Sequence, residues 1–260
     1  MSEGIGDAIA AGVEDAVGTE TGIGTDDGAV ATLEKPEKVE EKAEETDRFL
    51  RQRAIIPREK MLQQTATVIG VGAGGRQVAW MLASLGVPKI QLIDHDAIEL
   101  HNVTTQGYYH EQIGMKKVDA VKDLIEKIDP AIKVGMVRGK FTPNLVKGNA
   151  VFCCVDSITT RADIWHTIGK EAPFWVDGRM RAETMLVYSA TDEASREFYE
   201  ETLFPEAEAQ VGACTGRGTI YTASIVAGLM VAQFAKYLRG MPTDHEQIFN
   251  LLAGEISVKP

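Results

Sequence analysis

Residues 67–77 decide the fold, and they read Thr67-Val68-Ile69-Gly70-Val71-Gly72-Ala73-Gly74-Gly75-Arg76-Gln77. The apolar run ends in clustered glycines, an apolar helical pattern follows to residue 85, and a second apolar run, 89–93, ends at Asp94. This order of strand, glycine turn, helix, strand and acid is typical of adenine-nucleotide sites, because glycines let the backbone approach phosphates and the acid binds ribose hydroxyls. The motif predicts a nucleotide site but does not separate ATP from NAD.

The remaining elements predict the class of fold. Strand patterns are expected at residues 132–137, 150–155, 174–176 and 184–190. Helical or partly helical patterns are expected at residues 116–128, 160–170, 195–204 and 219–238. This alternation predicts an α/β fold, a Rossmann-like and mostly parallel sheet with helices on both faces.

Acidic charge is concentrated at the start of the chain. Of the 260 residues, the first 45 contain 13 acids, 3 lysines and no aromatic residue, whereas the rest is nearly neutral with 25 acids and 24 bases. This composition predicts a disordered acidic tail at 1–45, a nucleotide-binding domain at 46–240 and a C-terminal extension at 241–260. Because no basic surplus is present, we expect no nucleic-acid partner.

Cysteine usage and hydropathy indicate the compartment. Cys153, Cys154 and Cys214 form neither a disulfide framework nor a paired Cys-x-x-Cys motif, so no zinc is expected. The apolar segment Ile220–Leu238 raises the question of a membrane span, but it contains polar residues such as Lys236, and a buried core or interface helix is the better interpretation. With no signal sequence at the start, a cytoplasmic protein without membrane attachment is expected.

Further polar residues recur in a fixed order along the chain. The series comprises Arg51, Asp94, Asp96, Glu99, Asn102, Gln106, Lys117, Asp156 and Arg161. From residue 48 to residue 238 this order and spacing resembles the ThiF/MoeB/HesA family, the bacterial relatives of ubiquitin-activating enzymes. The resemblance implies a homodimeric, ATP- and Mg²⁺-dependent adenylyltransferase. Its substrate would be the C-terminal carboxylate of a small ubiquitin-like or sulfur-carrier protein, activated as an acyl-adenylate.

The resemblance also implies which residues bind ATP. They are Gly72, Gly74, Gly75, Asp94, Asp96, Asn102, Gln106 and Lys117. Asp94 matches the ribose-binding acid, although a strand-end acid that caps the next turn is the alternative. Lys117 matches a lysine that neutralises phosphate charge during attack on the α-phosphate, although a solvated surface lysine is the alternative.

Two further catalytic residues follow from the same resemblance. Asp156 matches an aspartate associated with Mg²⁺ and ATP, while a helix N-cap is the competing interpretation. Arg51 matches an arginine that one subunit contributes to its partner's ATP, with Arg48 and Arg53 as close alternatives.

Two positions depart from the family pattern. Gln77 stands where a third glycine is common, and Thr105 stands where relatives carry the arginine of an Asn-x-x-Arg-Gln motif. Loss of that arginine removes a phosphate or ribose contact. Residues that could compensate are Arg76, Lys116, Arg179 and Arg181.

Cys214 lies in a glycine-rich segment before the last helix. In relatives a cysteine here sometimes forms a thioester or persulfide bond, and the neighbouring Arg217 would favour its thiolate. A small residue packed under a loop is the alternative. Two rival functions also stay open, a non-catalytic scaffold that keeps the fold and an NAD-dependent oxidoreductase.

Overall fold

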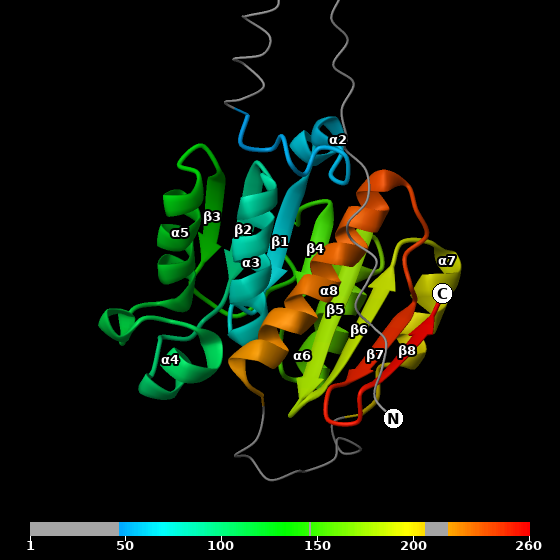
Figure 1. Cartoon of the computed structure of the whole chain (residues 1–260). Coiled ribbons are helices and arrows are strands. Elements are labelled where there is room, and N and C mark those ends of the chain that lie inside the picture. The colour runs from blue at the N-terminus through cyan, green and yellow to red at the C-terminus, as the bar shows by residue number, and fades with distance from the viewer. Residues whose placement is uncertain (1–46, 146, 206–217) are drawn as a thin grey trace, which may run out of the picture. The chain divides into compact units, whose positions relative to one another are not determined.

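A single sheet of eight strands organises the computed structural model, which describes residues 47–145, 147–205 and 218–260. The strands are β1 (Thr65–Ile69), β2 (Lys89–Ile93), β3 (Lys133–Val137), β4 (Ala150–Cys153), β5 (Phe174–Arg181), β6 (Thr184–Ala190), β7 (Glu246–Asn250) and β8 (Glu255–Lys259). Their order is β3-β2-β1-β4-β5-β6-β7-β8 (Figure 1). The first five strands in this order run parallel, and the last three are antiparallel.

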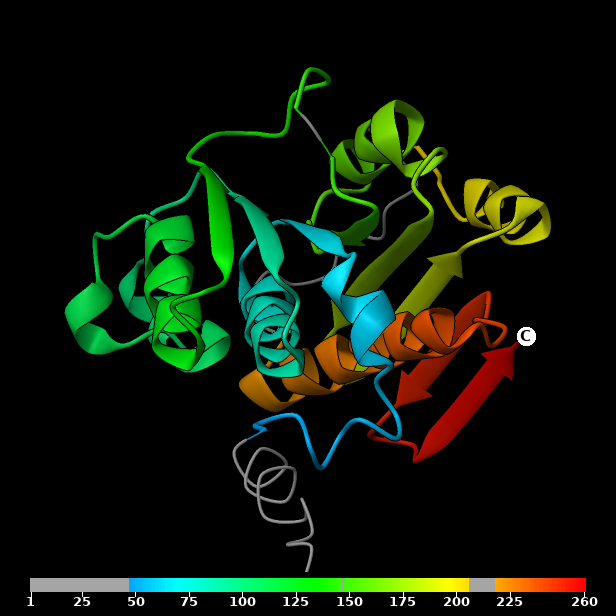
Figure 2. The same ribbon diagram turned by 90° about the horizontal axis from the view of Figure 1, so that it is seen from above.

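Helices cover both faces of the sheet. They are α2 (Arg58–Leu62), α3 (Ala73–Leu85), α4 (Leu100–Gln106), α5 (Lys117–Ile128), α6 (Ile158–Ile164), α7 (Glu193–Glu201) and α8 (Ile220–Arg239). Helices α3, α5 and α8 lie on one face, and α6 and α7 lie on the other (Figure 2). The predicted Rossmann-like α/β class is therefore confirmed.

The buried core is divided by the sheet into two layers. On the α3 and α8 side, Phe152, Phe174 and Phe234 pack with ring centroids 5.2–5.7 Å apart. On the α6 and α7 side, the ring centroid of Trp165 lies 4.5 Å from that of Tyr199. Strand β4 is buried along its whole length, which explains its continuous apolar sequence, since central parallel strands face helices on both sides.

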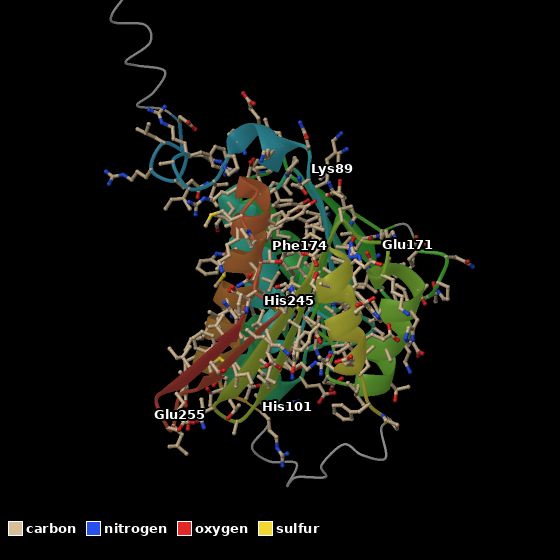
Figure 3. The ribbon with its side chains drawn as sticks, turned by 90° about the vertical axis from the view of Figure 1, so that its right-hand side faces the viewer. Lys89, His101, Glu171, Phe174, His245 and Glu255 are labelled. Carbon is tan, nitrogen blue, oxygen red and sulfur yellow. The ribbon has the colours of Figure 1, made fainter. Side chains whose placement is uncertain are left out.

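The strand order creates a switch point at β1. From β1 the chain moves to β2 and β3 on one side and later returns to β4 on the other, so the connections diverge at the carboxyl ends of β1 and β4. Open α/β sheets bind ligands at such a point. Figure 3 shows the two ends of the sheet, with Lys89 at the start of β2 and His101 of α4 at the end where the parallel strands finish.

Helix α8 belongs to the protein core. It begins at an N-cap, Thr219, whose side chain accepts a hydrogen bond from the Thr222 backbone, and it buries Val226, Met230 and Phe234 against α3 and β5. Within the described part of the chain, no helix is long and apolar enough to cross a membrane.

Several elements differ from the sequence predictions. Strand β5 continues to Arg181 instead of ending at residue 176, because it turns at Ala182 (φ 51°) and pairs antiparallel with β6. Residues 246–250 and 255–259, within the predicted extension, form the hairpin of β7 and β8 and extend the same sheet. Neither α4 nor this hairpin was predicted, since α4 lacks a clear apolar period and each strand of the hairpin is only five residues long.

Candidate active site

The glycine turn connects the end of β1 to the start of α3. Gly70 has a positive φ of 83°, and a Cβ placed on it would lie 2.8 Å from the Cys154 carbonyl oxygen. A Cβ on Gly75 would lie only 1.8 Å from the Gly70 carbonyl oxygen. The motif is therefore Gly70-x-Gly72-x-x-Gly75, and Gly75 is the glycine that packs the helix against the strand. The expectation that Gln77 replaces the third glycine was wrong, because the motif begins at Gly70 and its third glycine is Gly75.

The first turn of α3 has no close contact at Gly72 or Gly74. Gly72 is the N-cap of α3, and the nearest atom to a Cβ on Gly74 would be Val226 Cγ1 at 3.8 Å. A Cβ on Gly72 would lie 3.7 Å from the Gln106 side-chain oxygen, Oε1, which is buried and has no hydrogen-bond partner among the described residues. Uncapped helix N–H groups next to an unsatisfied acceptor fit a bound phosphate ester with its ribose hydroxyls.

Asp94 joins the end of β2 to the glycine turn. Its Oδ2 accepts a 2.8 Å hydrogen bond from the Val71 backbone N–H, and its Oδ1 accepts a 2.8 Å bond from the Asp96 N–H. Tyr108 donates its hydroxyl to the Val71 carbonyl oxygen and so holds the turn from the other side. Asp94 therefore caps the turn, and because a carboxylate has about four acceptor positions, this role leaves capacity for ribose hydroxyls.

Lys117 and Asp96 form the charged pair of the site. Lys117 Nζ lies 2.8 Å from Asp96 Oδ2, and the Lys117 side chain is only 7% exposed, so it is not a solvated surface lysine. Burial alone would raise the pKa of Asp96, but the hydrogen bond and charge of Lys117 outweigh it and hold that pKa below the ordinary value. Asn102 accepts a 2.9 Å bond from the Glu99 N–H and thereby caps α4 beside the pair.

Asp156 is exposed in the turn after β4, across the switch point from the glycine turn. The N-cap of α6 is Ser157, whose Oγ accepts a 3.2 Å bond from the Thr160 N–H. The interpretation of Asp156 as that N-cap was therefore wrong. Asp94, His95 and Asp96 also bring three potential metal ligands within 4.8 Å, but backbone N–H groups and Lys117 already engage the two carboxylates.

A buried network of ion pairs lies next to the turn that carries Asp156. Fully buried Asp177 accepts 2.7 Å bonds from Arg161 Nε and Arg179 Nε, and a 3.0 Å bond from the Tyr199 hydroxyl. Burial would raise the pKa of Asp177, but the two arginines outweigh it and hold that pKa below its ordinary value. Sequence reasoning missed this network because Asp177 comes from β5 whereas Arg161 and Tyr199 come from α6 and α7.

The two arginines extend from Asp177 to the segments on either side. Arg161 donates to the carbonyl oxygen of Val155, the residue before Asp156. Arg179 donates to the backbone and side-chain oxygens of Thr202, at distances of 3.0 and 2.9 Å. The network thus fixes the turn that carries Asp156, and it engages Arg179, which cannot also replace the arginine missing at position 105.

Arg51 lies far from the site of its own chain. In the same segment Gln52 donates to the carbonyl oxygen of Leu85, the last residue of α3, and Arg48 donates to the Ile128 carbonyl at the end of α5. Since α3 has 13 residues, its two ends are roughly 20 Å apart, and the glycine turn is at the other end. Arg51 is exposed, whereas the alternative Arg48 is paired with Asp129.

The cysteines differ in position. Burial raises the pKa of the Cys153 thiol to about 12 and also raises that of Cys154, so neither is a ready nucleophile. Cys214, the predicted thioester residue, lies outside the described residues.

The fold and the polar residues around the glycine turn define the class of the protein, which has a Rossmann-like fold with a candidate nucleotide-binding site. The sequence profile of the ThiF family matches residues 47–255, and the chain belongs to that family. It is 27% identical over 135 residues to ubiquitin-like modifier-activating enzyme 5 of Caenorhabditis elegans, an alignment that covers 46% of this chain and 32% of the relative. The aligned region is thus about a third of that relative's length.

Two solved structures share the fold at low sequence identity. PaaA superposes with a TM-score of 0.64 at 20% identity, covering 90% of this chain and 77% of PaaA. MccB of E. coli, solved with ATP, superposes with a TM-score of 0.63 at 14% identity, covering 83% of this chain and 72% of MccB. At these identities the likeness establishes the fold.

Proposed function

We propose that the protein is an ATP-dependent adenylyltransferase that activates a carboxylate as its acyl-adenylate. The observation that carries this proposal is the ion pair of buried Lys117 with the partly exposed Asp96, which Asp94 connects to the glycine turn. A buried ammonium suits phosphoryl transfer, in which positioned cations stabilise the charge that develops on the phosphates.

Each residue of the candidate site has a separate role in this proposed reaction. Helix α3 and its glycines receive the phosphates, Asp94 holds the ribose, and Lys117 neutralises the charge that develops at the α-phosphate. The substrate carboxylate forms a bond to the α-phosphorus while the bond to pyrophosphate breaks, so no protein nucleophile is required. Asp156 would hold Mg²⁺, which neutralises phosphate charge when bound.

The partner we propose is a small ubiquitin-like or sulfur-carrier protein that offers its C-terminal carboxylate. Family membership and the name of the C. elegans relative support a ubiquitin-like partner, and MccB has also been solved with MccA. A second step, in which Cys214 displaces AMP to form a thioester, belongs to the same proposal. The cytoplasm, where ATP is available, is the proposed location.

We also propose a homodimer in which Arg51 of each subunit serves the site of the other. The separation of Arg51 from its own glycine turn supports this, since a role for Arg51 at an ATP site then requires the site of another subunit. Mixing Arg51→Ala subunits with Asp156→Ala subunits should restore part of the activity, because one site of the heterodimer keeps both residues. Sedimentation as a monomer under active conditions would contradict the dimer.

A non-catalytic scaffold is the second candidate, and Thr105 favours it. Its hydroxyl donates a 2.8 Å bond to the His101 carbonyl within α4 and offers no cation to a phosphate.

The test combines nucleotide binding with ATP–pyrophosphate exchange, using a ubiquitin-like protein that ends in Gly-Gly as the carboxylate donor. Lys117→Ala should weaken ATP binding about tenfold or more and abolish exchange, because a charge-assisted contact to phosphate is lost. Lys122→Ala, in the same helix but paired with Glu126 on the surface, is the matched control and should leave both unchanged. ATP binding without exchange by the wild type would favour the scaffold, and a preference for NAD would favour the oxidoreductase.

A further inference from the structure

Arg76 is a buried guanidinium that has no anionic partner among the residues that the structure describes. The residue is only 8% exposed, yet its contacts within the described residues are with two aromatic rings. Its Cζ lies 5.3 Å from the ring centroid of Tyr108 and 5.8 Å from that of Tyr109. No carboxylate in residues 47–145, 147–205 or 218–260 pairs with it. Because a permanently charged side chain is rarely buried unpaired, its position indicates that an anion completes the site.

The location of Arg76 identifies the kind of anion. Arg76 is the fourth residue of the 13-residue helix α3, in the turn that begins at the glycines. The ring of Tyr108 beneath it is tied to the glycine turn through the hydroxyl bond to the Val71 carbonyl. Arg76 therefore adds a cation to a helix N-terminus already suited to phosphate.

The same guanidinium also lies at the end of α4, where Thr105 stands. A Cβ on Gly107, two residues after Thr105, would lie 3.2 Å from Arg76 Nη1. The Thr105 hydroxyl itself donates a hydrogen bond to the His101 carbonyl oxygen. Two of the other cations considered from the sequence are less suitable, since Lys116 Nζ donates to the His95 carbonyl and Arg179 is held by Asp177.

We propose that Arg76 binds the phosphate groups of the nucleotide and replaces the arginine that is absent at Thr105. This inference rests on the proposed ATP site and extends it, since it assigns the phosphate contact to a side chain of α3 instead of one of α4. It also explains why a chain that lacks the family's arginine need not have lost its nucleotide. Guanidinium suits this role because its planar donors bind two phosphate oxygens at once.

The experiment measures the binding of ATP and of adenosine to the full chain by calorimetry. Arg76→Gln should weaken ATP binding by about tenfold to a hundredfold and leave adenosine binding unchanged, because only the phosphate contact is removed. Arg76→Lys should restore part of the ATP affinity. Arg138→Gln, an exposed arginine paired with Asp119, is the matched control and should bind ATP as the wild type does.

A double variant makes the test specific. If Arg76 replaces the missing arginine, Arg76→Gln combined with Thr105→Arg should bind ATP more tightly than Arg76→Gln alone. The inference is overturned if Arg76→Gln binds ATP as the wild type does, or if it loses ATP and adenosine equally, which would indicate a structural role. A wild type that binds neither ATP nor adenosine would instead overturn the proposed function and this inference together.

Discussion

Replacing Asp177 by asparagine tests the buried ion network directly. The substitution keeps the shape of the side chain but leaves Arg161, with a side chain 5% exposed, and Arg179, 14% exposed, without their counter-charge. Removing one partner of a buried ion pair costs about 3–5 kcal/mol, a large part of a typical folding free energy of about 5–15 kcal/mol. At a urea m-value of about 2 kcal/mol per M, the unfolding midpoint should fall by roughly 2 M.

Tryptophan fluorescence during urea titration measures this shift, because Trp165 and Trp175 pack against Tyr199 beside the network. The control is Asp119→Asn, which breaks an equally short contact, 2.6 Å, to the exposed Arg138. Surface pairs contribute little, so the midpoint of this control should move far less. If both variants shift the midpoint equally, burial is not the cause and the reasoning fails.

The pH dependence of the same variant has a defined sign. The folded-state pKa of Asp177 lies below the ordinary value of 3.8, so the stability that its charge contributes is present above pH 3.8 and is lost as the pH falls through the folded-state value. The difference between wild type and Asp177→Asn should therefore stay constant from pH 7 to pH 5 and narrow only below about pH 4. A difference that already changes near pH 6 would assign the effect to another group.

Two further predictions concern the glycine turn and the cysteines. Gly75→Ala should lower the free energy of unfolding by at least about 1–3 kcal/mol, because its Cβ would lie 1.8 Å from the Gly70 carbonyl oxygen. Gly74→Ala has room for the added methyl group and should stabilise α3 by about 0.5–1 kcal/mol. Melting temperatures that do not separate the two variants would refute the packing argument. Cys214→Ala should keep pyrophosphate exchange but eliminate any thiol-sensitive adduct with the partner. Buried Cys153 should be alkylated slowly in the native state, as followed by mass spectrometry. An adduct that persists in the alanine variant would assign the thioester to another residue.

Local sequence was sufficient wherever one stretch of chain carries the whole signal. The glycine turn, the β2 strand ending at Asp94 and the amphipathic helix α5 were predictable, because turn chemistry and apolar period act over neighbouring residues. The register of the glycines required the structure, since the close approach of Gly75 to Gly70 is a contact between a helix and the end of a strand.

Tertiary structure alone decided what distant segments do together. Sequence named Lys117 and Asp96 separately, but only the packing of α5 against the segment after β2 turned Lys117 into a buried partner of Asp96. Packing likewise fixed Arg179 on Asp177 and left Arg76 buried without a carboxylate among the described residues. The physical reason is that propensity and periodicity record only local preferences. The burial of a charge, and the partner that makes it tolerable, depend on which elements the fold brings side by side.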